Sequence, residues 1–533
     1  MMDIWSWICE LPNNDDWGES DPHPPLAFTM ASSEEGDSSS TRSIQLKAER
    51  TMGSDSEVCI TFTISFEGFQ SSPLWVSDPC PLSSEQPFLA LVLQLLQETI
   101  SRSPAMPNTI CPRSQLQKLK PEPISWIIES HSPESFSSFF NLVLLTRLFW
   151  LCSWDAPSEI GSFYFQYLLG PNIEALTFKQ VPVLRTFLVS TGVDTELCFM
   201  RTLGYMLTKW IILSELSVGL KTLITPLKGQ QQHLGFSYAT EAHGYWTLKG
   251  YAPVNAMKLL HSSDQKSQFP ATGAKGSLLR YALAHQQLEA VIQLEYTIGF
   301  HDGYIQVNAR VDNLRFHVAR LGFSKKNDDM DDFLNEKHFP SRIRVWVGPE
   351  VGSTYVSGLT LGRSTNNGEN EVETQRILKG SFGKYSKDSP HVKARARVSM
   401  KNKMKNWRWD QDAEGNAAVF DAVLCDNVTG QEIATWKSLY QNSNGSSHGF
   451  QHRYYGANRP FTKAGGLVFA GDDYGEGVGW RLNRDMEGSV LKWRIGGEVW
   501  LSYWPNNVRS SYVETRCVEW CDEVDLPLIP PEK

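Results

Sequence analysis

The sequence contains few cysteines and no long apolar segment that is free of charge. Nine cysteines among 533 residues are sparse, scattered and odd in number, which argues against a disulfide framework and favours free thiols. The most apolar segment, 136–154, carries Arg147, and a charge near the middle of a lone membrane span is unfavourable. We therefore interpret this segment as a buried core helix and expect no transmembrane span.

The first residues also lack the pattern of a secretory signal. Asp3 and Glu10 are acidic where such a signal is basic, and the apolar run between them is broken. We expect a cytoplasmic protein, with the nucleus as the alternative, that is not secreted.

No metal or cofactor motif is recognisable. Cys517 and Cys521 lie four residues apart on an expected strand, without a second cysteine or histidine pair at zinc-ligand spacing. We assign no catalytic residue, no metal and no cofactor. A non-enzymatic protein is favoured, and the question of enzymatic activity stays open.

The chain is acidic at one end only. Residues 1–60 carry 12 Asp and Glu against 3 Lys and Arg, which accounts for the whole formal charge of −9. The other 473 residues hold 47 acidic and 47 basic residues, so their net charge is zero. A local basic surface on this neutral part is compatible with an anionic partner.

Composition and periodicity divide the chain into four segments. Residues 1–55 are rich in Ser, Asp, Glu, Asn and Pro, and we expect a disordered acidic tail with a short Trp motif. Residues 56–120 begin with an alternating strand pattern and continue into an amphipathic helix. Residues 121–230 are predicted to be a helical region, and residues 235–525 an antiparallel β domain.

The Trp motif of the tail allows two interpretations. Trp5 and Trp7 lie among other apolar residues, ahead of an acidic segment. In one interpretation the motif binds a protein partner and becomes ordered on binding. In the other it folds back onto the surface of the protein itself. The sequence does not rank the two.

The helical region contains start and stop signals. Ser132 and Pro133 suit an N-cap and a first helical turn. Gly170 and Pro171 predict the end of a second helix, and a third helical pattern spans 195–225.

The β domain is indicated by period-two patterns and short turns. Apolar and polar residues alternate over 292–298 and 305–311, and the His-Asp-Gly turn at 301–303 joins them into a hairpin. The Gly-Gly pair at 496–497 predicts a second hairpin. Antiparallel pairing with short turns excludes a doubly wound parallel sheet. We predict an α+β chain whose β domain is a sandwich or a curved open sheet.

A basic strand face is the most distinctive feature of the β domain. Along 393–409, alternate residues place six cations and two indoles on one side, opposite small apolar residues in the first half. Same-face residues lie ~7 Å apart, so a regular strand suits an extended anionic partner. Asn402 and Asn406 favour a bend or an end near residue 401, which would give a compact patch instead. The predicted basic face consists of Lys393, Arg395, Arg397, Lys401, Lys403, Lys405, Trp407 and Trp409.

Arg342 and Arg344 repeat this pattern on another expected strand, with Trp346 on the same face. Cations among indoles attract phosphate or carboxylate groups, while the rings stack on bases, sugars or lipids. The alternative is a solvated outer face, where Lys and Arg prevent edge-to-edge aggregation without any ligand.

A Gly-rich loop at 471–479 is a second candidate site. It gathers Asp472, Asp473 and Glu476 ahead of Trp480. Such carboxylates can bind calcium or act as acid and base, but the spacing matches no EF-hand, and polar turns use the same residue types.

The leading hypothesis is a cytosolic binding or scaffold protein whose β domain presents a basic, Trp-bearing surface to an anionic partner. That partner would be an acidic lipid, a glycan or a nucleic acid. The alternative is a hydrolase-like enzyme that acts on a carbohydrate or lipid-like substrate through the acidic loop. The natural ligand, the oligomeric state and the strand order stay open.

Overall fold

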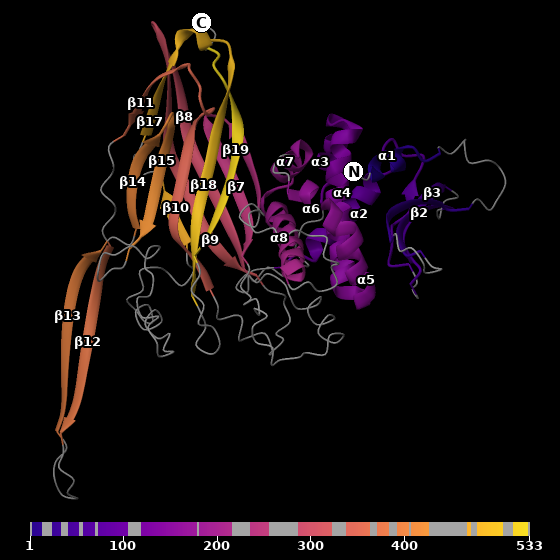
Figure 1. Ribbon diagram of the computed structural model, residues 1–533, viewed down its shortest axis with the longest axis horizontal. Helices are drawn as coiled ribbons and strands as arrows, with labels where there is room; N and C mark the ends of the chain where they lie inside the picture. Colours follow the sequence, from indigo (N-terminus) through magenta and orange to yellow (C-terminus); the bar gives the residue numbers. More distant parts are fainter. Residues whose placement is uncertain are drawn as a thin grey trace, which may run out of the picture. The chain divides into compact units, whose positions relative to one another are not determined.

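The structure, a computed structural model, consists of helices and antiparallel sheets, which confirms the predicted α+β class (Figure 1). It describes residues 3–12, 24–33, 41–52, 57–69, 73–104, 119–177, 181–215, 235–254, 286–321, 337–362, 370–382, 392–404, 407–425, 466–470, 477–504 and 515–530. The chain divides into two compact units. Unit one comprises Met1–Tyr238, Gly250–Glu289 and Ala319–Leu334, and unit two comprises Ala239–Lys249, Ala290–Val318 and Asn335–Lys533.

Unit one begins with a small antiparallel sheet. Alternate residues of its two long central strands are buried, because one face of the sheet packs into the core of the unit. The strand pattern predicted at the start of 56–120 is confirmed by the third strand. The sheet consists of β1 (Leu26–Ser32), β2 (Ser43–Met52), β3 (Val58–Glu67) and β4 (Trp75–Val76) in this order, with β5 (Cys80–Pro81) beside β3.

Two of these strands, with helix α1 (Ile4–Cys9), lie in the segment predicted to be a disordered tail. They correct that prediction for the residues that they contain, and most of the remaining tail lies outside the described residues. The signal was weak because β2 buries only Ile44, Leu46 and Ala48 as apolar side chains among polar neighbours. Strand β2 pairs with β3 along its whole length, and this pairing provides hydrogen-bond partners for the backbone of β2. The composition of residues 43–52 alone does not show that such a partner strand exists.

The helices of unit one gather in one bundle (Figure 1). Helix α4 begins as predicted, because Ser132 Oγ accepts a hydrogen bond from the Ser135 N–H at 3.3 Å and Pro133 occupies the first turn. The bundle consists of α2 (Leu89–Ser101), α3 (Pro121–Ser130), α4 (Pro133–Trp150), α5 (Ser158–Phe163), α6 (Gly170–Thr177), α7 (Pro182–Ser190) and α8 (Val193–Glu215). The π-helical turns η2 (Leu151–Asp155) and η3 (Tyr164–Leu169) follow α4 and α5.

Helix α4 contains the most apolar segment of the chain. Among the described helices, only Pro133–Ser153 is long and apolar enough to cross a membrane, judged by length and composition. In the structure 83 % of its apolar window is buried inside the protein. Arg147 forms an ion pair with Glu98 of α2, so this charge has a partner within the protein. These contacts agree with a core helix.

The predicted helix end at Gly170 is wrong. The chain stays helical from η3 into α6, and Gly170 has a φ of −53°. A Cβ at Gly170 would lie 3.2 Å from the Trp210 ring of α8. Glycine here allows two helices to approach closely and does not cap a helix.

Helix α1 carries the Trp motif. Asp3 Oδ1 caps it by accepting a hydrogen bond from the Ser6 N–H at 2.9 Å, and accepts a second from Ser137 Oγ of α4 at 2.6 Å. Trp5 is 5 % exposed and Trp7 is half-buried. The motif therefore packs on the protein itself, and a partner that bound Trp5 would have to displace it from the core.

Most of unit two is formed by two open antiparallel sheets. One has the strand order β11-β17-β9-β8-β7-β6, with β16 beside β9, and the other has the order β14-β15-β10-β18-β19. The strands of the first sheet are β6 (Phe236–Ala242), β7 (Tyr245–Val254), β8 (Gln286–His301), β9 (Tyr304–Arg320), β11 (Val356–Leu361), β16 (Gly466–Ala470) and β17 (Gly477–Asn483). Those of the second are β10 (Lys337–Pro349), β14 (Trp407–Glu414), β15 (Ala417–Leu424), β18 (Val490–Trp504) and β19 (Thr515–Pro527).

The two sheets pack face to face around indole rings. Trp246 of β7 stacks on Trp493 of β18 with ring centroids 5.0 Å apart, and Trp480 of β17 meets Trp493 edge-on at 4.7 Å. All three side chains are fully buried. This arrangement is a sandwich, one of the two β architectures that the sequence predicted.

One of the two predicted hairpins is confirmed and the other is wrong. Strands β8 and β9 are neighbours joined at 301–303, where Gly303 has a φ of +95°. Gly496 and Gly497 instead lie in the middle of β18, paired with β10. A Cβ at Gly496 would collide with the Trp346 ring, so the glycine makes room for an indole and does not form a turn.

Candidate anion-binding site

Most of the predicted basic face lies on β13 (Val392–Met404), which pairs with β12 (Asn370–Phe382) (Figure 1). In the part of the chain that the structure describes, neither strand pairs with a third. The register runs from Asn370↔Met404 to Phe382↔Val392 without a shift. Residues two apart on each strand therefore share one face of the hairpin along its whole length.

One face of this hairpin holds the cations of β13. Directly opposed residues in an antiparallel pair lie on the same face, so the register also identifies the β12 residues beside them. Lys405 lies outside the described residues. The opposed pairs of this face are Ser381↔Lys393, Lys379↔Arg395, Ile377↔Arg397, Gln375↔Ser399, Glu373↔Lys401 and Glu371↔Lys403.

The register shows that the charged residues are unevenly distributed along the hairpin. Lys401 and Lys403 are opposed by glutamates, whereas Arg395 is opposed by Lys379. The twelve residues from Ile377↔Arg397 to Phe382↔Val392 include four cations and no acid, and we name them the cationic half. The fourteen others include three cations and two acids, so the net charges of the two halves are +4 and +1.

Lys379 was not predicted as a site residue. No strand is predicted over 370–382, although the charged residues Glu371, Glu373 and Lys379 occupy alternate positions, as residues on one face of a strand do. This alternation was the available signal, but it lacks the apolar regularity of β13. The position of Lys379 beside Arg395 follows only from the register.

The two indoles of the predicted basic face lie on a different strand. Strand β14 pairs with β15 in the sandwich and not with β12 or β13. Trp409 is 1 % exposed and stacks on Phe420 with centroids 5.6 Å apart, while Trp407 is half-buried. The face is therefore not continuous from 393 to 409, and Trp409 belongs to the core.

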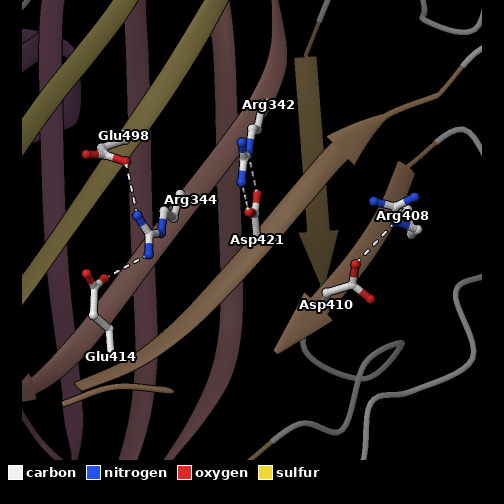
Figure 2. Close-up of polar contacts among 7 residues, drawn as sticks. All are labelled: Arg342, Arg344, Arg408, Asp410, Glu414, Asp421 and Glu498. Atoms are coloured by element: carbon white, nitrogen blue, oxygen red, sulfur yellow. Dashed lines mark hydrogen bonds and ion pairs between the residues drawn. The ribbon is translucent and has the colours of Figure 1, made fainter. Parts of the chain in front are cut away.

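Arg342 and Arg344 of β10 are ion-paired (Figure 2). Arg342 donates to both carboxylate oxygens of Asp421, with Nε 2.9 Å from Oδ1. Arg344 Nη2 lies 2.8 Å from Glu414 Oε2, and its Nη1 lies 3.9 Å from Glu498 Oε2. These contacts pair both guanidinium groups with carboxylates of the protein itself.

These ion pairs correct the prediction of a second basic strand. Two arginines are matched by three carboxylates from β14, β15 and β18, so this surface adds no net positive charge. The Arg342 guanidinium also lies 5.0 Å from the Trp500 ring centroid. Burial raises the pKa of Glu498, although Arg344 acts in the opposite direction. Strand order, which brings these residues together, was not predictable from the sequence.

The three carboxylates of the predicted acidic loop precede β17, which begins at Gly477. Asp472, Asp473 and Glu476 lie outside the described residues. Trp480 is fully buried, and its Nε1–H donates a hydrogen bond to the Asn416 carbonyl at 2.8 Å, so it belongs to the sandwich core and does not edge a cleft. Within the described stretches, no group of three or more His, Cys, Asp or Glu side chains could hold a metal ion.

Comparison with known proteins identifies no family. No family model and no curated protein matches the sequence. Two solved structures with partial likeness are the Clostridium perfringens NetB toxin in the membrane inserted form and the Clostridium perfringens delta-toxin. Their identities are 8 % and 9 %, each match covers 55 % of this chain and 94 % or 96 % of the toxin, and the TM-scores are 0.18 and 0.21. At these scores the likeness carries no argument about fold or function.

Proposed function

We propose that this chain binds an anionic partner through the cationic half of the β12–β13 hairpin. The observation that carries the proposal is the register, which places Lys379 and Arg395 opposite each other with Lys393 and Arg397 on the same face. No acid lies among the twelve residues of this half.

Like charges at opposed positions destabilise an antiparallel pair. Same-face neighbours along a strand are ~7 Å apart, so the three β13 cations span ~14 Å. An anion bound to this face offsets their mutual repulsion. The register of β13 is continuous to Met404, so the bend near residue 401 that would have folded the basic face into a compact patch is absent from this strand, and the four cations lie together because Lys379 of β12 is opposed to Arg395.

The competing interpretation is a strand face whose lysines and arginines only keep it solvated. The other half of the same hairpin provides a comparison, because there each lysine of the face is opposed by a glutamate. A face that only needs solvation has no reason to differ between its two halves. The difference supports a site at the cationic half.

The proposal is tested with heparin as a polyanionic probe. Replacing Lys393, Arg395 and Arg397 with Ser removes three of the four cations, and we expect heparin affinity to fall by at least tenfold at low salt. High salt should weaken the parent protein more than the variant. A control variant with Arg342→Gln and Arg344→Gln should bind like the parent. Equal binding by the parent and the Ser variant at low and high salt overturns the proposal.

A further inference from the structure

We infer that the anionic partner is the surface of a lipid bilayer that contains acidic lipids. This inference rests on the proposed function and adds the class of partner. It comes from the second face of the cationic half, which the anion-binding argument does not use.

The second face of the cationic half is wholly apolar in composition. Its opposed pairs are Leu378↔Ala396, Gly380↔Ala394 and Phe382↔Val392. In the other half, the corresponding face includes Arg376, Thr374 and two asparagines. The cations that have no opposed acid and the uninterrupted apolar face therefore occupy the same half of the hairpin, one on each side.

This coincidence distinguishes between classes of anionic partner. A soluble polyanion, such as a glycan or a nucleic acid, contacts the cations, but its bases or sugars can stack only on Phe382 among the apolar residues of this half. A bilayer surface offers both chemistries at once. Apolar residues enter the boundary between head groups and acyl chains, while Lys and Arg extend to the phosphates. The two faces of this half match that pair of requirements.

The expected location of the protein fits the same partner. The sequence predicts a cytoplasmic protein, and acidic lipids give the cytoplasmic leaflet a negative surface potential. Each Lys or Arg near such a surface contributes measurably to binding, so four cations and one apolar face supply two reinforcing signals.

Leu378 and Phe382 are expected to provide most of the apolar contribution. Gly380, Ala394 and Ala396 are small, so little apolar surface can be buried at their positions. Replacing Leu378 and Phe382 with Ser keeps the charge of the hairpin unchanged. This double variant therefore separates the lipid inference from the anion-binding proposal.

The experiment compares vesicles of neutral lipid, vesicles that contain phosphatidylserine, and heparin. We expect the parent protein to bind the acidic vesicles at least tenfold more tightly than the neutral ones. The variant with Leu378→Ser and Phe382→Ser should lose at least tenfold of the vesicle affinity while its heparin affinity stays within twofold. The matched control is Val372→Ser with Met400→Ser, on the same face in the other half, and it should bind both probes like the parent.

Each other outcome has a defined meaning. Parent protein that binds heparin but not acidic vesicles overturns the lipid inference and leaves the proposed function standing. Vesicle binding that survives the Leu378 and Phe382 substitutions overturns it as well, because the apolar face then does not enter the bilayer. A variant that also loses heparin binding contradicts the inference, because the apolar face then serves folding. Parent protein that binds none of these probes overturns both proposals.

Discussion

Arg395 of β13 is placed directly opposite Lys379 of β12, so two cations share one cross-strand position. Farther along the same two strands, Lys401 is placed opposite Glu373. On one face, the hairpin thus has one cation opposed by another cation and one cation opposed by an acid. We assign the anion site to the half in which cations oppose each other, and we interpret the half in which glutamates oppose the lysines as a solvated strand face. The predictions about binding follow from this assignment.

Replacing Lys379 with Glu should stabilise the hairpin and weaken anion binding at the same time. The substitution turns an opposed pair of like charges into a pair of opposite charges, which is worth about 0.2–1 kcal/mol. Amide hydrogen exchange of 370–382 and 392–404 should become slower, while heparin affinity falls. Lys379→Gln is the control, with a smaller effect on both measurements. Unchanged heparin affinity in Lys379→Glu would show that this position lies outside the site.

The arginines of β10 should affect stability and not anion binding. Asp421→Asn removes the carboxylate that Arg342 contacts through two nitrogens, and we expect the free energy of unfolding to fall by roughly 1 kcal/mol, because the pair is partly exposed. Urea titration measures this change. Heparin affinity should stay within twofold. A gain in heparin affinity above that range would indicate that freeing Arg342 creates a second anion site.

A methyl group at Gly496 should destabilise the sandwich through one neighbour. Gly496→Ala places its Cβ against the Trp346 ring, and overpacking of this kind costs about 1–3 kcal/mol. The same substitution in a Trp346→Ala background should cost less, because the indole is no longer there. Urea titration of the two single variants and the double variant tests this coupling. Additive effects would mean that the strain arises elsewhere.

Attachment of helix α1 should weaken in acid. Burial would raise the pKa of Asp3, but hydrogen bonds from Ser137 and Ser6 outweigh it and hold the pKa below the ordinary value of 3.8. A carboxyl whose pKa is lower in the folded state stabilises that state fully above its unfolded pKa, and the stabilisation is lost as the pH falls through the folded pKa.

We therefore expect the hydrogen-exchange protection factors of residues 3–12 to decrease below about pH 4. Asp3→Asn should remove most of this pH dependence, and Asp3→Ala should lower the stability of the helix by about 1 kcal/mol at neutral pH, because it loses the N-cap. A parent protein whose protection of 3–12 does not change with pH would contradict the role of Asp3.

Sequence patterns predicted correctly those helices and strands that depend mainly on residues close together in the chain. The alternation of β3 and the Ser132 cap were visible because a strand face and a helix start depend on neighbouring residues. Glycines were misinterpreted because a glycine permits either a turn or a close approach. At Gly496 the role is a close approach, because the Trp346 ring occupies the space of a Cβ. Trp210 has the same effect at Gly170.

The sequence predicted which residues of β13 share a face, but it did not predict which residues of other strands lie opposite them. The cations of β13 share a face by parity alone, so sequence identified them. Whether each cation is balanced depends on the opposed residue, which is Lys379 for Arg395 and Glu373 for Lys401. The pairing of Arg342 with Asp421 depends in the same way on strand order, which no local pattern encodes.

The most direct test of the account compares two double variants with identical changes in charge and residue type. Lys379→Gln with Lys393→Gln removes two cations from the cationic half, and Lys401→Gln with Lys403→Gln removes two from the other half of the same face. The second pair is opposed by glutamates in the register, and it lies beyond a Debye length of ~8 Å from the cationic half at physiological salt. Titration with phosphatidylserine vesicles and with heparin should show at least a tenfold loss of affinity for the first variant and less than threefold for the second. Equal losses would mean that net charge alone drives binding and that the hairpin has no defined site.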